Sequence, residues 1–195
     1  MRKRLLYFLS LLIGFSLFIG CSSTPKKLDT NEDMLADTGE LTLIELQKSA
    51  VRIGKTIGEY FKKNPNPDGV FVALLPTKND TSEQIAVDVY DNTLVSELRK
   101  NGIFTVRTAT RNQALSEIQF SQTGLTDKPL SVGKMKSPNY FVKTDINESM
   151  FRHSGDRIVE QAINTEMIEV TTQIAAWSDR VTYRKKAVSG SGTGW

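Results

Sequence analysis

The one cysteine of this 195-residue chain, Cys21, is its first candidate for covalent chemistry. It follows a basic leader from Arg2 to Arg4 and a nearly unbroken apolar run from Leu5 to Phe18. This layout is typical of a secretory signal peptide, and the run is shorter than the roughly 20 residues that a lasting membrane span needs. The residues after the cysteine are polar, so no core is available there to bury the thiol. We therefore expect an attachment point rather than a buried or catalytic thiol.

The residues Phe18-Ile19-Gly20-Cys21 resemble a bacterial lipobox, with Phe18 where leucine is usual. In such a motif the thiol receives diacylglycerol before the peptidase cuts, and a further fatty acid such as palmitate joins the new amino terminus. Several acyl chains hold a protein on a membrane much longer than a single chain does. The motif predicts a signal peptide over 1–20 and a membrane lipoprotein that is lipidated at Cys21.

The second candidate is the chain's one histidine, His153, beside Ser154 and Asp156. A catalytic triad is assembled from distant parts of the chain and also needs an oxyanion site, so adjacency indicates an exposed turn instead. One histidine without a free cysteine cannot supply the usual zinc ligands. The glycines between Ser189 and Gly194 precede no helix, so they form no phosphate loop. We expect no catalytic residue, metal, cofactor or small-molecule substrate, and hence no enzyme.

The net charge of the chain limits the kinds of partner that it is expected to bind. The formal net charge is +3, and Arg2, Lys3 and Arg4 leave with the signal peptide, so the remaining chain is neutral. A neutral chain offers no electrostatic basis for binding nucleic acid. Other charged and aromatic residues have both a structural and a functional interpretation. Asp145, Glu148 and Glu160 form either a cluster or a solvated face, and Arg184 to Lys186 form either a solvated strand end or a contact with acidic surfaces. Trp177 serves either in packing or as a partner anchor, and Trp195 is either a solvated terminus or an adhesive plug.

Composition divides the mature chain into three parts. Residues 21–40 carry the lipidated cysteine and then a polar stretch with few apolar positions, which predicts a flexible tether. Fully extended, such a tether reaches at most about 65 Å. Residues 189–195 predict a flexible tail, and residues 41–188 are long enough for one domain with its own core.

Within that domain, helical and extended patterns alternate. Apolar residues recur at helical spacing over 41–62 and 82–100, and short apolar runs predict strands at 70–76 and 103–106, parallel to each other because a helix separates them. Shorter helices are expected at 111–120 and near 130–136.

Three long segments near the C-terminus are rich in β-branched and aromatic residues: 140–151, 157–170 and 173–186. Turns are expected at 154–156 and 171–172. The sum is an α+β fold, a single domain with a mixed sheet, a C-terminal antiparallel meander and helices packed on one or both faces.

Three stretches of this domain resemble penicillin-binding-protein activator lipoproteins of the LpoB type: 72–76 before a polar loop and a helix, 130–142 leading into a strand, and 167–179 as a closing hairpin with Trp177. The resemblance covers about 70–186. It implies an outer-membrane lipoprotein, facing the periplasm, that binds a class A penicillin-binding protein and stimulates peptidoglycan synthesis. The alternative is a lipoprotein of a secretion, curli-like or flagellar envelope assembly. The partner surface is not set by these motifs, and exposed loops at 77–83, 120–130 and 152–157 are its candidates.

Overall fold

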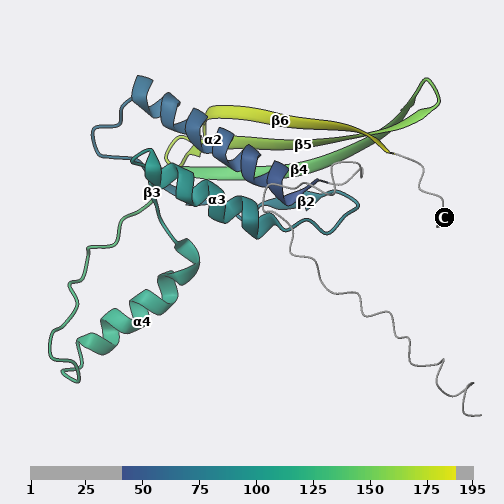
Figure 1. Ribbon diagram of the computed structural model, residues 1–195. Coiled ribbons are helices and arrows are strands. Elements are labelled where there is room, and N and C mark those ends of the chain that lie inside the picture. Colours follow the sequence, from purple (N-terminus) through teal and green to yellow (C-terminus); the bar gives the residue numbers. More distant parts are fainter. Residues whose placement is uncertain (1–40, 188–195) are drawn as a thin grey trace, which may run out of the picture. The chain divides into compact units, whose positions relative to one another are not determined.

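The computed structural model describes residues 41–187, which Figure 1 shows in colour. The predictions for the signal peptide, Cys21, the tether and the tail with Trp195 lie outside the described residues. Within 41–187, no helix combines the length and the apolar character that crossing a membrane requires.

The first described helix, α2, spans Leu43–Lys63 and confirms the helix predicted over 41–62. Its start is fixed by a capping box, in which the Thr42 Oγ1 accepts the Glu45 N–H at 3.2 Å and the Glu45 carboxylate accepts the Thr42 N–H at 2.9 Å. The apolar stripe of this helix is buried: Leu46, Ala50, Ile53, Ile57 and Phe61. The apolar residues that recur at helical spacing in the sequence are therefore the residues that α2 buries.

The second helix, α3, spans Val87–Lys100 and packs along α2. The helix was predicted to start at residue 82, which is wrong by about five residues. The side-chain amide of Asn79 donates to the Glu83 carbonyl at 2.7 Å, and its oxygen accepts the Thr81 N–H at 3.1 Å. These bonds hold the chain in a turn where it would otherwise begin the helix.

Two short parallel strands begin the sheet. Strand β1 (Phe71–Leu74) pairs in parallel with β3 (Phe104–Thr105), as predicted, and on its other side with β4 (Tyr140–His153). Asn139 joins β1 to β4, because its side-chain oxygen accepts the Phe71 N–H and its amide donates to the Gly69 carbonyl, each at 2.8 Å. Strand β2 (Lys78–Asp80) follows β1 along the same edge of β4, and the sequence did not predict it.

Strands β4, β5 (Asp156–Glu169) and β6 (Ala175–Ala187) form the predicted antiparallel meander. The order in the sheet is β3-β1-β4-β5-β6. Ser154 and Gly155 make the turn between β4 and β5, both with positive φ, 52° and 87°. Between β5 and β6 the residue with positive φ is Gln173. The predicted turns are confirmed within a residue or two.

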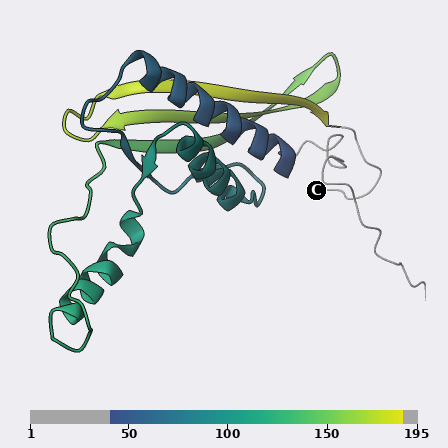
Figure 2. The ribbon, with the colours of Figure 1, turned by 60° about the vertical axis from the view of Figure 1, so that its left-hand side comes forward.

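The sheet has two unequal faces, and helices α2 and α3 lie over one of them (Figures 1 and 2). Alternate residues of the long strands point into the core under these helices, namely Val142, Ile146, Ile163, Met167 and Val181. The fold is thus the predicted α+β domain with a mixed sheet, and this pair of helices packs on a single face.

Helix α4 (Arg111–Ser121) confirms the helix predicted over 111–120. The helix predicted near 130–136 is wrong, since those residues are not helical and Gly133 has a φ of 76°. Leu130 bonds back to α4 instead: its N–H donates to the Ser121 Oγ at 2.9 Å, and its carbonyl accepts the Gln122 amide at 2.7 Å.

Candidate partner-binding face

The side chains on the sheet face opposite α2 and α3 form a surface with charged, polar and aromatic groups. We call it the open face. The strand registers place the following side chains there: Phe71, Phe104, Phe141, Lys143, Asp145, Asn147, Ser149, Glu160, Ala162, Asn164, Glu166, Ile168, Ser178, Arg180, Thr182 and Arg184. Side chains alternate along a strand, so the burial of one set under the helices turns the set named above to the opposite side. Of that set, Ala162 alone is buried.

The meander part of the open face carries alternating charges. Lys143 Nζ lies 2.8 Å from the Asp145 carboxylate and 3.5 Å from that of Glu166. Glu160 accepts from the Arg184 guanidinium at 2.5 Å and lies 3.6 Å from that of Arg180. Ion pairs this exposed contribute little to stability. Their charges can therefore turn to a partner at low cost.

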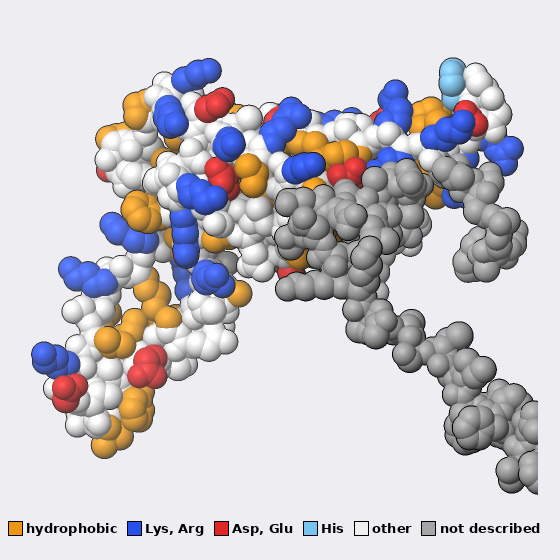
Figure 3. Space-filling view, viewed as in Figure 1, with side chains coloured by type: hydrophobic (Ala, Val, Ile, Leu, Met, Phe, Trp, Pro, Cys, Tyr) orange, Lys and Arg blue, Asp and Glu red, His pale blue; other side chains and the backbone are white. Residues whose placement is uncertain are grey.

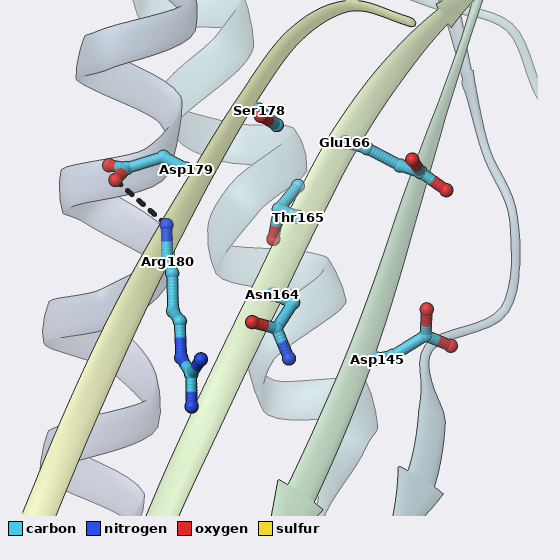
Figure 4. A pocket seen from close by; sticks show the side chains of 7 residues that line it. All are labelled: Asp145, Asn164, Thr165, Glu166, Ser178, Asp179 and Arg180. Atoms are coloured by element: carbon cyan, nitrogen blue, oxygen red, sulfur yellow. Dashed lines mark hydrogen bonds between the residues drawn. The ribbon is translucent and has the colours of Figure 1, made fainter.

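A hollow of about 510 Å³ lies at the centre of these charges. Figure 4 shows Asp145 and Glu166 on one side of it, Arg180 on the other and Asn164 between them, contributed by β4, β5 and β6. On the open face the lining offers carboxylates, a guanidinium, the Ser178 hydroxyl and the Asn164 amide, without a histidine or a thiol. The hollow can recognise polar or charged groups, and it holds no nucleophile with an adjacent base.

The other end of the open face is aromatic. Phe71 and Phe104 stack with their ring centroids 5.6 Å apart, and Phe104 is 61% exposed. The Lys136 Nζ lies 5.4 Å from the centre of the Phe71 ring, a favourable cation–π distance. Exposed aromatic side chains next to charges are the composition that binding hot spots favour.

Two lysines next to the hollow are held in the charged form. The carboxylate of Asp145 accepts a hydrogen bond from Lys143 and raises the pKa of its ammonium above the ordinary value. Asp80 does the same for the pKa of Lys78, which lies beside Asp145 because β2 pairs with β4. Both pKa shifts favour the charged ammonium groups at this edge of the open face.

The histidine candidates do not assemble into a catalytic site. His153 is exposed at the end of β4 and pairs with Asp156 across the hairpin, and the Asp156 carboxylate is bound by the Lys186 Nζ at 2.7 Å. Among the described residues, no group of three or more histidine, cysteine, aspartate or glutamate side chains is placed to hold a metal ion.

The three acidic candidates on the strands do not form one cluster. Asp145 and Glu160 lie on the open face, each with its own basic partners. Glu148 projects to the other face, where it accepts from the Ser82 hydroxyl at 2.8 Å and the Gln161 amide at 3.2 Å. Asp145 and Glu148 are three residues apart on the same strand, so alternation puts them on opposite faces, and the register of β5 then places Glu160 on the face of Asp145.

The remaining candidates are largely structural. Trp177 is half-buried and packs against the core under the helices. The three basic residues near the end of β6 each bind a carboxylate: Arg184 binds Glu160, Lys185 binds Glu45 and Lys186 binds Asp156. They are ordered by ion pairs rather than merely solvated. Sequence reasoning missed Phe104 and Arg180, since neither stands out until the registers are known.

Comparison with known proteins agrees with this architecture. The family model described as peptidoglycan-synthase activator LpoB matches residues 41–183, from the capping box of α2 into the last strand of the meander. The chain belongs to the LpoB family. That family is one of regulatory activators of peptidoglycan synthases, which accords with a surface suited to recognition.

Solved LpoB structures are similar to this chain in part. The C-terminal domain of LpoB from Escherichia coli is 16% identical, with a TM-score of 0.44 over 71% of this chain and 98% of that one. The corresponding domain from Salmonella enterica is also 16% identical, with a TM-score of 0.40 over 71% of this chain and 94% of that one. No curated protein sequence matches the chain.

Proposed function

We propose that this LpoB-family protein is lipidated at Cys21, held in the outer membrane facing the periplasm, and stimulates a class A penicillin-binding protein by binding it. The observation that carries the proposal is the family match over 41–183. The signal-peptide pattern and the cysteine at its end support the anchor. The site geometry supports a binding role, since the open face presents recognition groups without catalytic machinery.

The docking surface in this proposal is the open face. Phe104 supplies an exposed aromatic anchor, and the charges around Asp145 and Arg180 supply complementary partners for polar groups. Two of the three candidate loops, 77–83 and 152–157, contribute at its margins. Residues 77–83 contain β2, which extends the sheet beside β4, and residues 152–157 form the tip of the β4–β5 hairpin.

Binding alone is sufficient for activation. A regulator that prefers the active conformation of its partner shifts the partner's equilibrium by the difference of its two affinities. A preference of about 1.4 kcal/mol changes that equilibrium tenfold. No proton transfer or covalent step on the regulator is required.

The test measures glycan polymerisation by the organism's purified class A synthases, with and without residues 21–195 carrying Cys21→Ser, together with direct binding. The chain with a wild-type open face should bind a synthase and stimulate its glycan polymerisation. Phe104→Asp and Arg180→Glu should weaken binding by roughly tenfold or more, because the loss of a hot-spot residue costs about 2 kcal/mol.

Two variants on the helix side serve as matched controls. Leu43→Asp changes another exposed apolar residue, 54% accessible, and Lys55→Glu reverses an exposed charge on α2. Both should bind normally. Failure of the wild-type chain to bind or stimulate any of the synthases rejects the activator role and favours a secretion, curli-like or flagellar assembly, which crosslinking in intact cells would then identify. An equal loss of binding in the open-face variants and in the control variants rejects the open face as the docking surface, and it leaves the activator role in place.

A further inference from the structure

Half of the exposed large hydrophobic side chains in the described chain lie in one segment, residues 107–136, which comprises α4 and its flanks. Six of twelve belong to it: Leu115, Phe120, Leu125, Leu130, Val132 and Met135. Leu125 and Val132 are 75% and 73% accessible, more than any other residue of the twelve. Figure 3 shows hydrophobic side chains at the surface over α4, with lysine and arginine side chains among them.

These side chains are not needed to hold the segment together. Ser121 is the one residue of α4 that is buried. The segment is closed by polar bonds instead, from Leu130 and Gln122 as described above and from the Arg111 guanidinium, which donates to the Lys136 carbonyl at 3.1 Å. Apolar surface that a fold exposes and does not use is a mark of binding.

The segment also differs from the remaining chain in charge. It contains five basic residues, Arg107, Arg111, Lys128, Lys134 and Lys136, against two acidic ones, Glu117 and Asp127. Its net charge is therefore +3, whereas the chain from residue 21 onward is neutral as a whole. The positive charge and the exposed apolar side chains thus occupy the same 30 residues.

We propose that residues 107–136 bind the surface of an anionic lipid membrane. Interfacial segments combine lysine and arginine, which attract anionic headgroups, with leucine, phenylalanine and similar residues that enter the boundary of the acyl region. Lys128 and Lys134 lie close in sequence to Leu125 and Val132, so that charge and apolar contact act together.

This second membrane contact would act with the proposed anchor at Cys21, and in that respect it rests on the proposed function. Residues 22–40 separate Cys21 from the domain by 19 residues, at most about 65 Å of chain. The bilayer is therefore within reach of the segment, and a weak lipid contact becomes effective because it is intramolecular.

The experiment uses residues 21–195 with Cys21→Ser, so that no acyl chain contributes, and measures cosedimentation with vesicles. Vesicles of equal parts phosphatidylethanolamine and phosphatidylglycerol should bind the protein, and vesicles of phosphatidylcholine should bind it at least about tenfold more weakly. High salt should reduce the binding. The double variant Leu125→Glu/Val132→Glu should lose it.

The double variant Leu43→Glu/Ile174→Glu is the matched control, because it makes the same change in charge at two exposed apolar residues outside the segment. It should bind as the wild type does, and circular dichroism should show both variants folded. Absence of binding to the anionic vesicles, equal binding to phosphatidylcholine, or equal loss in the control overturns the proposal. Stimulation of a synthase in detergent should survive Leu125→Glu/Val132→Glu, and its loss would assign the segment to the synthase instead.

Discussion

The close packing of α2 on α3 depends on two glycines, Gly54 and Gly58, that face the second helix. A methyl group at position 54 would lie 2.7 Å from both Cβ and Cγ of Glu97. At position 58 it would lie 2.6 Å from the side-chain amide of Asn101. The Cβ of Glu97 cannot rotate away, because it is fixed to the backbone of α3. Gly54→Ala therefore forces the two helices apart.

The magnitude follows from two opposed effects. Alanine is favoured over glycine within a helix by about 1 kcal/mol. Overpacking a tight contact costs about 1–3 kcal/mol, and the upper half of that range applies because one of the two obstructing atoms is immobile. We expect Gly54→Ala to lower the free energy of unfolding by about 1–2 kcal/mol, or the melting temperature by about 2–8 °C for a chain of this size.

The assay is equilibrium denaturation of a double-mutant cycle with Glu97→Gly, which removes both obstructing atoms. The double variant should recover at least about 1 kcal/mol relative to the sum of the single changes. Gln47→Ala, on the exposed side of the same helix, should stay within about 0.5 kcal/mol of the wild type. An unchanged or raised stability of Gly54→Ala, with additive effects in the cycle, would refute the close-packing argument.

Three further outcomes are expected. Cys21→Ser should abolish incorporation of a fatty-acid probe and leave the fold intact by circular dichroism, and undiminished labelling would contradict the assignment of the anchor. Burial raises the pKa of Tyr90, whose hydroxyl lies 3.0 Å from that of Thr165, so stability present below the ordinary tyrosine value of 10.0 should be lost as the pH rises above it. Denaturation as a function of pH should show a shallower loss for Tyr90→Phe, and an identical slope would count against this assignment. Lys185→Ala should lower the free energy of unfolding by roughly 3 kcal/mol, because it leaves the largely buried carboxylate of Glu45 without its ammonium at 2.8 Å, and calorimetry that shows no change would exclude that role.

The sequence was sufficient to predict the elements whose apolar residues follow a helical or extended pattern. The stripe of α2, the apolar run of β1 and the β-branched segments of β4 to β6 were all predicted within a few residues. It was insufficient where tertiary contacts set the conformation. Strand β2 contains three polar residues and becomes a strand because β4 pairs with it. The helix expected near 130–136 does not form, since Leu130 bonds to the end of α4 instead.

The same division applies to the site. The signal-peptide pattern ending at Cys21 predicted an anchored protein, and the resemblance of residues 70–186 to LpoB-type activators predicted a binding role. Only the registers of β4, β5 and β6 decided that Asp145 and Arg180 share a face. A strand's side chains alternate with a period of two, so each face is set by pairing between segments far apart in the chain. Composition cannot encode that pairing, and the packing of α2 and α3 on one side leaves the other side exposed to solvent.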